Sequence, residues 1–347
     1  MSSKRLKLAF TVAGTVIGAG FATGKELMMF FQNEPISLLF LCLAMLVMGC
    51  VSLLYFAQQK DSSFLPETSF LKKTVRALFW LFSGASYTVM LACGGEVLRE
   101  SVGLWAPAGT VVTWAITMGI VFFGIQNVYR FNLIATPLLL ICMTGISLAG
   151  LLSPAGLFGG SQTPTVNLLL YSGYNLLSVL PVLDALHHTV KKQEGYWGIF
   201  WGFFLVTAMG LLLKGLLLRF SHLTAESSIP VLSVVTHCHN NLNMFYTAML
   251  YLSILTTAVN SLYAVTKEKN PLTAGILLLG CSFLGFSTLI ETLYPLFGYL
   301  GIGVILMIIG EVLIKPIGKD EQNVKRKKRD SEYHFRKPRK TFGIRRD

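Results

Sequence analysis

The residues best suited to bind a small ion or solute lie in an apolar run at approximately residues 8–31. Gly14, Gly18, Gly20 and Gly24 interrupt this run, which at about 1.5 Å per residue is long enough to cross a bilayer. A helix broken there would offer amide groups that suit a carboxylate and carbonyl groups that suit a cation. The alternative is that the glycines only allow straight helices to pack closely.

A second polar stretch with helix-breaking residues lies in the apolar run at residues 166–187. It reads Tyr171-Ser-Gly-Tyr-Asn175. Interrupted helices in matching positions of two halves are typical of transporters, whose binding sites lie between them. Because this run would open the second half of the chain, we expect both leading helices to be discontinuous. The sequence therefore predicts a solute site between them, with Tyr171 and Tyr174 as candidate aromatic contacts.

Hydroxyl groups in a third apolar run, at residues 243–266, could complete a cation site. This run contains Leu255-Thr-Thr-Ala-Val-Asn-Ser261. Thr256 and Thr257 could supply the oxygen ligands that hard cations such as Na⁺ prefer. The alternative is that both hydroxyls donate to carbonyls one turn earlier in their own helix, as Thr in membrane helices often does.

Ionisable side chains inside the apolar runs need protein or water around them, because a charge at the bilayer centre costs about 2.5–3.5 kcal/mol. Lys25 and Glu26 lie in the outer half of the first run, where they could line an access vestibule, or Glu26 could carry a coupled proton. Glu96 lies one turn before Arg99, which indicates a structural ion pair. Lys214 is expected to extend its charged end to the membrane surface.

The composition is that of an integral membrane protein. Of 347 residues, 53% are hydrophobic and only 13% are charged, whereas soluble domains carry about 25% charged residues. Long apolar runs exclude a β-barrel, whose strands alternate over short segments. The lack of polar stripes between them argues against a soluble helical bundle. The predicted fold class is therefore all-α and membrane-spanning.

Ten apolar runs have the length of membrane spans. With the N-terminus in the cytoplasm, nearly all Lys and Arg residues between the spans fall on the cytoplasmic side, as the positive-inside rule requires. We therefore predict a multi-pass protein of the cell membrane with both termini in the cytoplasm. The approximate limits of the spans are 8–31, 36–57, 75–98, 109–126, 131–152, 166–187, 195–218, 243–266, 271–289 and 293–314.

The spans divide the chain into two halves. Residues 1–152 and 166–314 hold five spans each, and residues 153–165 form a Gly/Pro/Ser-rich linker. Because five is an odd number, the second half would enter the membrane from the opposite face, as in an inverted repeat. Thirteen of the 29 Lys and Arg residues fall within 315–347. We expect this stretch to be a disordered cytoplasmic tail that contacts anionic lipid, with no nucleic-acid partner.

The polar segment at residues 220–243 contains Pro230. It is expected to form a short helix across the outer face, packed through its apolar part at residues 229–235. Such a segment could act as a lid or serve only as a connector.

Three of these patterns, in the first span, at Ser172–Asn175 and at Leu255–Val259, resemble a known family. The motif Gly14-Thr-Val-Ile-Gly-Ala-Gly-Phe21 resembles the unwound first helix of the amino acid–polyamine–organocation (APC) superfamily, which has the LeuT fold. The longer run that continues to Glu26 is similar to the uncharacterised bacterial YkvI-type membrane proteins, and the resemblance extends across all ten spans. It implies ten transmembrane helices in a LeuT-like 5+5 inverted repeat with discontinuous first and sixth helices.

The resemblance also implies ligand positions. Sodium-coupled members hold one Na⁺ between carbonyls of the first span and oxygens of the eighth. They hold a substrate carboxylate on first-span amides, with the broken sixth span facing the substrate. The matching positions for Na⁺ are Gly14, Ile17, Ser253, Thr256 and Thr257, and those for substrate are Gly18, Ala19, Gly20, Ser172, Gly173, Tyr174 and Asn175, beside Tyr171. Proton-coupled members can replace this ion by a fifth-span Lys, but residues 132–151 contain none, which favours sodium.

The function predicted from these observations is secondary transport of a small organic solute by alternating access. An amino acid or related carboxylate is the expected substrate, and Na⁺ symport is the expected coupling, with proton-coupled symport or exchange as the alternative. The sequence holds no Walker motif, so the energy must come from a gradient. It also holds no H-E-x-x-H pair or nucleophile motif, so an enzyme is not expected. A membrane-embedded enzyme and a non-transporting receptor remain rivals of another class.

Overall fold

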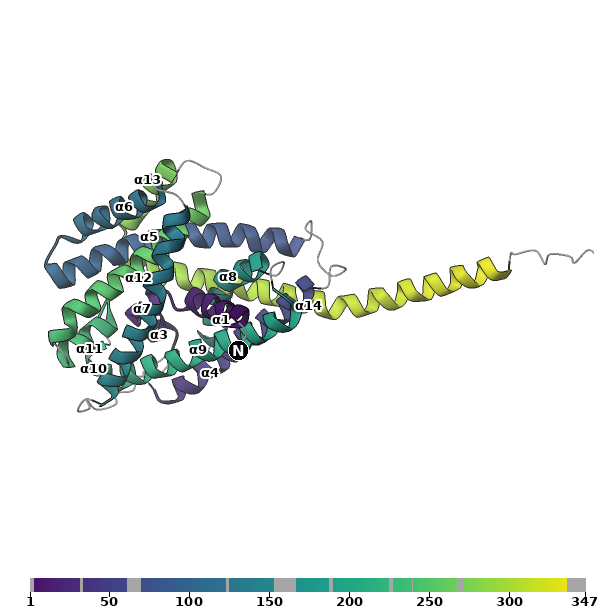
Figure 1. The fold of residues 1–347 in the computed structure, drawn as a ribbon, viewed down its shortest axis with the longest axis horizontal. Coiled ribbons are helices and arrows are strands. Elements are labelled where there is room, and N and C mark those ends of the chain that lie inside the picture. Colours follow the sequence, from purple (N-terminus) through teal and green to yellow (C-terminus); the bar gives the residue numbers. More distant parts are fainter. Residues whose placement is uncertain are drawn as a thin grey trace, which may run out of the picture. The chain divides into compact units, whose positions relative to one another are not determined.

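The computed structural model describes residues 3–31, 34–60, 70–122, 125–152, 167–186, 190–224, 227–238, 240–266 and 271–335. The regular elements within these ranges are all helices (Figure 1). They are α1 (Ser3–Val16), α2 (Ala19–Thr23), α3 (Lys25–Phe30), α4 (Ile36–Lys60), α5 (Phe70–Val102), α6 (Ala106–Phe122), α7 (Ile125–Leu152), α8 (Asn167–Leu186), α9 (Lys192–Arg219), α10 (Ser221–Thr224), α11 (Pro230–Cys238), α12 (Asn240–Thr266), α13 (Pro271–Ser282) and α14 (Phe286–Phe335).

Helices lie at the positions of all ten predicted spans, and α1, α2 and α3 together occupy the first. Their lengths and compositions are those of a multi-pass membrane protein, while the count of ten spans and the inverted repeat stay predictions. Among the described residues, five helices are long and apolar enough to cross a membrane: Ile36–Gln58, Lys73–Val102, Lys192–Arg219, Leu242–Thr266 and Phe286–Val312. Shorter apolar helices cover Ala106–Phe122, Leu140–Leu152 and Pro271–Ser282.

The last two spans divide at a different place from the predicted one. Helix α13 ends at Ser282, and the chain turns at Gly285, whose φ of 91° lies in the left-handed region that glycine adopts readily. Thr292, predicted to lie in a loop, is inside α14. The turn thus falls within the run 271–289 that was predicted as the ninth span.

The prediction of a discontinuous sixth helix is wrong, because α8 is one continuous helix. Its Gly173 packs against the backbone of α14, where a methyl group would overlap Gly298 O and lie 2.8 Å from Ile302 N. Gly301 of α14 packs reciprocally against Gly173. This glycine therefore allows two helices to approach closely, as small residues do in membrane proteins, and does not open its own helix.

The polar side chains of α8 also stay within the helix. Ser172 Oγ donates to Leu168 O at 2.9 Å, and Asn175 Nδ2 donates to Tyr171 O at 3.1 Å. Such bonds to the preceding turn satisfy the polar groups without breaking the backbone ladder. Hence α8 carries the composition expected of a broken helix but remains intact.

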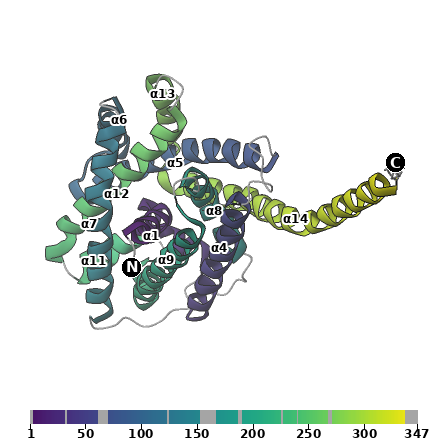
Figure 2. The ribbon, with the colours of Figure 1, turned by 45° about the vertical axis from the view of Figure 1, so that its right-hand side comes forward.

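Helix α1 lies in the interior beside α8 and α9 (Figure 1, Figure 2). Gly198 and Gly202 of α9 face Leu8 and Val12 of α1. At either glycine a methyl group would come within 2.8 Å of the facing side chain. Small residues on α9 thus let the two helices pack closely, which places the end of α1 in the core.

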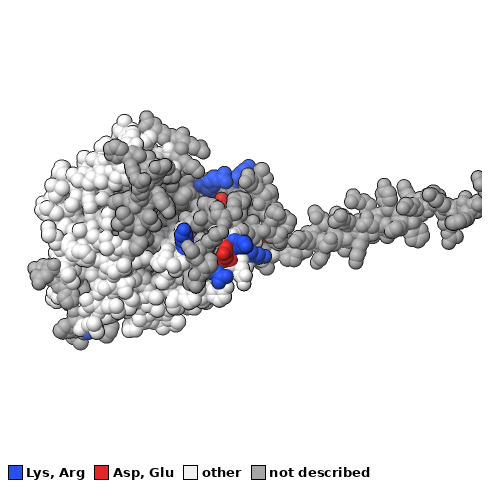
Figure 3. All heavy atoms as spheres, in the orientation of Figure 1, with Lys and Arg blue, Asp and Glu red and all other residues white. Residues whose placement is uncertain are grey.

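Basic side chains gather at one end of the visible face of the first unit (Figure 3). Helices α1 and α9 begin at the same end, because Gly198 near the start of α9 faces Leu8 near the start of α1. The exposed residues Lys7, Lys191 and Lys192 lie at these starts. All three belong to segments predicted to be cytoplasmic, and that orientation stays a prediction.

The described chain forms two units, Met1–Ile305 and Leu306–Asp347, and the candidate site lies in the first. In the second, α14 continues as a helix to Phe335, so residues 315–335 are helical where a disordered tail was expected. Lys, Arg and Glu favour helices, which accounts for the extension. Residues 336–347 and the predicted linker at 153–165 lie outside the described residues.

Candidate functional site

The first span is interrupted where its glycines predicted. Helix α1 ends at Val16 and α2 begins at Ala19, so Ile17 and Gly18 lie outside both helices. The Gly18 amide donates to Val16 O at 2.9 Å instead of to Gly14 O, its acceptor in a regular helix. Gly18 has φ −95° and ψ −169°, an extended conformation that no helix contains. The predicted discontinuity of the first helix is therefore confirmed.

Helix α12 brings a hydroxyl group to this break. The amide of Ala19 donates to Thr257 Oγ1 at 3.4 Å, and a Cβ added to Gly18 would lie 3.5 Å from the same oxygen. The neighbouring hydroxyl of Thr256 donates to Ser253 O at 2.7 Å, which is the bond to its own helix that the sequence left open. One of the two threonines therefore faces the break.

The five positions predicted to hold Na⁺ lie on two elements that meet here. Gly14 and Ile17 belong to the end of α1 and the break. Ser253, Thr256 and Thr257 share one face of α12, since they are spaced by three and four residues. Ser253 Oγ is buried and has no hydrogen-bond partner among the described residues. Of the predicted α12 ligands, Thr257 reaches the break, where it contacts Gly18 and Ala19 next to Ile17.

A second interruption separates α2 from α3. Gly24 has φ +79° and ψ −7°, a left-handed conformation that is costly for residues with a Cβ. Its amide donates to Phe21 O at 3.0 Å and closes α2. A Cβ at this position would lie 2.8 Å from Val231 of α11 and 3.1 Å from Leu217 of α9. Helix α2 is therefore a five-residue element with a break at each end.

Helix α11 covers the second break and confirms the short helix predicted within residues 220–243. Its buried side chains are Pro230, Val231, Leu232, Val234 and Val235. The chain just before it also contacts the first span, because Lys25 Nζ donates to Ser227 O at 3.4 Å. Residues 227–238 therefore pack against the junction between α2 and α3.

The carboxylate of Glu26 folds back onto α2 and is buried. Only 4% of Glu26 is exposed. Its Oε1 accepts a hydrogen bond from Tyr174 Oη at 3.1 Å, and its Oε2 is buried with no hydrogen-bond partner among the described residues. A Cβ on Gly20 would overlap Glu26 Oε1 and would lie 2.8 Å from Tyr294 Oη. The carboxylate therefore lies directly against the Gly20 backbone.

Aromatic rings from four helices enclose this carboxylate. Tyr174 of α8 stacks on Tyr294 of α14, with ring centroids 4.4 Å apart. Phe82 of α5 meets Tyr174 edge-on at 5.4 Å, and Phe30 of α3 lies 6.1 Å from the same ring. Such arrangements stabilise a packed interior and keep water away from Glu26.

A buried lysine holds the far end of α3. Lys214 of α9 is 0% exposed, and its Nζ donates to Phe31 O at 2.7 Å and to Leu27 O at 3.4 Å. These are the terminal carbonyls of α3, where a positive charge is favourable. The prediction that Lys214 extends to the membrane surface is wrong, because backbone oxygens of a short helix replace water as its partners.

Only some of the predicted solute contacts converge. Gly20 and Tyr174 meet at Glu26, and the Ala19 amide is engaged by Thr257. At Ala19 and Gly20, two of the three predicted first-span positions, side-chain oxygens of the protein itself contact the backbone in this conformation.

The remaining sixth-span positions face elsewhere. The single hydroxyl hydrogen of Ser172 is shared between Leu168 O and Ala44 O of α4, which lies 3.2 Å from Ser172 Oγ, and Gly173 packs on α14. Tyr171 is fully buried and packs edge-on against Phe31, with ring centroids 4.9 Å apart. The structure does not bring Ser172 and Gly173 to α2, because both serve contacts between helices.

Tyr294 and Phe82 were missed by the sequence. Aromatic residues make up 12% of the chain, and no motif links these two with the first span. Glu26 did carry a signal, since it is a lone carboxylate in an apolar run. The predicted ion pair between Glu96 and Arg99 is confirmed.

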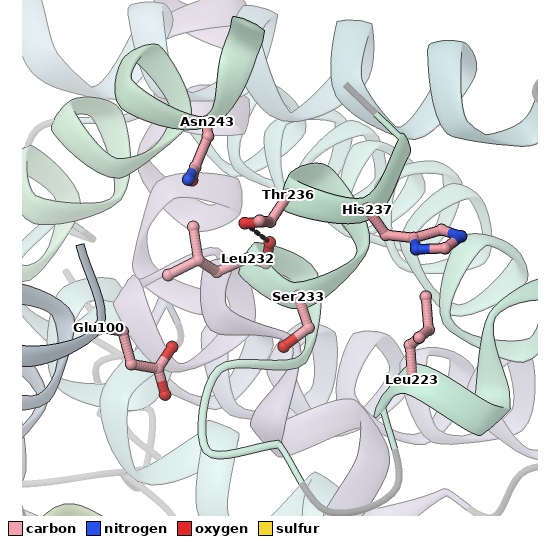
Figure 4. A pocket seen from close by; sticks show the side chains of 7 residues that line it. All are labelled: Glu100, Leu223, Leu232, Ser233, Thr236, His237 and Asn243. Carbon is pink, nitrogen blue, oxygen red and sulfur yellow. Dashed lines mark hydrogen bonds between the residues drawn. The ribbon is translucent and has the colours of Figure 1, made fainter. Parts of the chain in front are cut away.

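A pocket of about 680 Å³ lies beside α11, apart from the Glu26 cluster (Figure 4). It opens between the end of α5, the α10–α11 segment and the start of α12. Its lining shares no residue with the break at Gly18 or with the surroundings of Glu26. The lining residues are Glu100, Leu223, Leu232, Ser233, Thr236, His237 and Asn243.

Two proteins of Bacillus subtilis (strain 168) are similar to this chain over nearly their whole lengths. The uncharacterised membrane protein YkvI is 24% identical over an alignment of 350 positions, gaps included, that covers 89% of this chain and 95% of YkvI. The uncharacterised protein YyaD is 24% identical over 340 residues, with 88% and 96% covered. The chain is homologous to YkvI and YyaD. The resemblance to the YkvI-type proteins is confirmed, while no family model matches the chain.

Among solved structures, Mhp1 has a similar fold. Its inward-facing conformation gives a TM-score of 0.55 at 15% identity and covers 87% of this chain and 75% of Mhp1. Mhp1 is a nucleobase-cation-symport-1 family transporter, and its closed conformation with bromovinylhydantoin bound gives 0.51 at 14% identity, with 81% and 70% covered. At these identities the likeness shows the fold alone. The chain therefore has an Mhp1-like fold.

Proposed function

We propose that this chain is a secondary transporter that moves a small organic solute by alternating access. The observation that carries the proposal is the double interruption of the first span, which leaves α2 between two breaks within an Mhp1-like fold. Short segments at element ends can absorb the backbone changes of a hinge. Opened backbone inside a membrane protein is tolerated where it lines a site.

The proposed solute is an amino acid or a related small carboxylate. The amides at the start of α2 support this choice, because they favour an anionic group. In the present conformation Thr257 engages Ala19, and Glu26 covers Gly20, so the solute would bind after these side chains move. Mhp1 has been solved with bromovinylhydantoin bound, so hydantoins are also candidate solutes.

The proposed coupling ion is Na⁺, held at Gly14, Ile17, Ser253, Thr256 and Thr257. These positions offer carbonyl and hydroxyl oxygens, which suit a hard cation. Gly14 O has lost its regular donor to the turn at Gly18, and Thr257 Oγ1 faces the same break. Thr256 donates to its own helix but keeps oxygen lone pairs. Proton-coupled symport or exchange is the second candidate, favoured by the buried carboxylate of Glu26.

The test begins with ligand binding to the full-length protein. Amino acids, hydantoins and nucleobases are screened by thermal shift in NaCl and in choline chloride, because a ligand of the folded state raises its apparent stability. The best ligand is then radiolabelled and followed into proteoliposomes under a sodium gradient. We expect unchanged solute to accumulate. Binding without flux would indicate a receptor, and chemical conversion of the solute would indicate an enzyme.

The sodium assignment is tested separately with Thr257→Ala in the same vesicles. We expect the variant to lose the difference between NaCl and choline while keeping solute binding at high concentration. The control is Thr144→Ala, whose hydroxyl donates to Leu140 O in its own helix. Sodium dependence that persists in Thr257→Ala would contradict the assignment.

A further inference from the structure

We propose that Glu26 is the proton-binding residue of this carrier and that its proton couples to the movement of α2 and α3. The proposal deepens the proposed function, on which its transport arm rests. It places a proton at a position separate from the proposed sodium ligands, because Glu26 lies beyond Gly24 and contacts none of them.

The surroundings of Glu26 favour its neutral form. Glu26 is 4% exposed, and burying an unpaired carboxylate ion costs free energy that protonation avoids. Among the described residues, no Lys, Arg or His forms an ion pair with Glu26. The carboxylate has neutral hydroxyl partners in Tyr174, which donates to Oε1, and in Tyr294, while Oε2 has no partner in the described chain. A proton on Oε2 would leave the Tyr174 hydrogen bond in place.

The other ionisable groups on the elements around Glu26 have partners or contacts of their own. On its own helix, Lys25 Nζ donates to Ser227 O. Lys214 of α9 is bonded to the opposite end of α3. Tyr246 of α12 donates to Ala22 O at 2.9 Å. The remaining neighbours are the hydroxyls of Tyr171, Tyr174 and Tyr294 and the buried thiol of Cys93, none of which supplies a positive charge.

A proton fits this site better than a larger cation. The carboxylate lies against Gly20 so closely that even a methyl group there would overlap Oε1. The rings of Tyr174 and Tyr294 stack at 4.4 Å beside it. The pocket beside α11 is lined by other residues and does not include Glu26, Tyr174 or Tyr294. Binding of a proton from water requires only transient access, whereas an organic cation would have to separate these groups.

The backbone links the proton to motion. Glu26 is in the first turn of α3, directly after the left-handed Gly24, yet its carboxylate reaches back across α2 to Gly20. Rotation at Gly24 would separate Glu26 from Tyr174 and expose the carboxylate. Water would then stabilise the ion, so the proton would leave Oε2 for water and return when the helices close. A group with different proton affinities in two states couples its proton to the transition between them.

The first arm of the test detects the proton directly and needs no solute. Infrared difference spectra of the purified full-length protein in liposomes are recorded from acidic to alkaline pH. We expect a carbonyl band of one protonated carboxyl group in the wild type that is absent in Glu26→Gln. Tyr174→Phe should retain the band at a shifted frequency, because one hydrogen bond is lost. Glu96→Gln is the matched control and should leave the band unchanged.

The second arm measures uptake of the radiolabelled solute with an inward proton gradient and equal sodium on both sides. We expect the gradient to drive uptake by the wild type and by Glu96→Gln but not by Glu26→Gln, which should still exchange solute under equal conditions. Identical spectra of wild type and Glu26→Gln would overturn the proposal, as would gradient-driven uptake in Glu26→Gln. Absence of any flux in the wild type would instead refute the transport function, and the spectra would still decide whether Glu26 holds a proton.

Discussion

The first span and α8 have similar compositions but opposite structures. Each carries glycine and polar residues within an apolar run, yet the first span is broken twice and α8 is continuous. In α8 the glycine contacts another helix and the polar groups bond to the preceding turn. In the first span, side chains of other helices bond to the opened backbone. A membrane helix therefore opens where its neighbours supply partners for the released groups.

The largest effect on stability is expected from Gly173→Ala in α8. The new methyl group would overlap Gly298 O, and this backbone atom cannot move aside without separating α8 from α14. Overpacking at such a site costs about 3 kcal/mol, the upper end of the usual range. Thermal unfolding of the purified protein should show a large decrease in Tm.

The matched control is Gly145→Ala in α7, where a Cβ would meet no atom within 4 Å. Since Ala is about 1 kcal/mol better than Gly in a helix, this control should be neutral or slightly stabilising. A stable Gly173→Ala protein would show that close packing is not what keeps α8 continuous.

The second-largest effect on stability is expected at Lys214, which binds the carbonyl groups at the end of α3 in the broken first span. Lys214→Met removes the ammonium group from Phe31 O and Leu27 O. Leu27 O keeps the Phe31 amide as a donor, whereas Phe31 O loses the donor that Lys214 supplies. The expected loss is about 2 kcal/mol, measured by thermal unfolding. Lys192→Met at the exposed start of α9 is the control and should change Tm little. An equal Tm for Lys214→Met and the wild type would mean that α3 needs no cap.

The sequence predicted the broken first span correctly but not the continuous α8. The membrane class and the break at Gly18 were predictable, because apolar length and clustered glycines act locally. The continuity of α8 was not, since it depends on Gly298 and Gly301, more than a hundred residues away in sequence. The buried partners of Glu26 and Lys214 were not predictable either, because a hydrogen bond to a distant backbone oxygen leaves no periodic pattern.

The third effect tests the hinge after α2. Gly24→Ala places a side chain at φ +79°, which costs about 1–2 kcal/mol, and close to Val231 and Leu217. Because the strain applies only while Gly24 keeps this conformation, we expect solute exchange to slow along with the loss of Tm. Gly119→Ala in α6, where a Cβ meets nothing within 4 Å, is the control. Exchange at the wild-type rate would argue against a hinge at this position.

The smallest effect on stability, and the sharpest on the break itself, is expected from Thr257→Val. Valine keeps the shape of threonine but cannot accept the Ala19 hydrogen bond, which at 3.4 Å is long. Loss of this hydrogen bond should cost about 1 kcal/mol or less of folding free energy. Ser172→Ala in the continuous α8 should cost about as much, because it removes the contact of Ser172 Oγ with Ala44 O. The two variants would then differ in amide hydrogen exchange. Thr257→Val should increase exchange at Ala19, whose amide donates to Thr257 Oγ1, while Ser172→Ala should leave the backbone ladder of α8 protected. Equal protection at Ala19 in wild type and Thr257→Val would show that the break persists without help from α12.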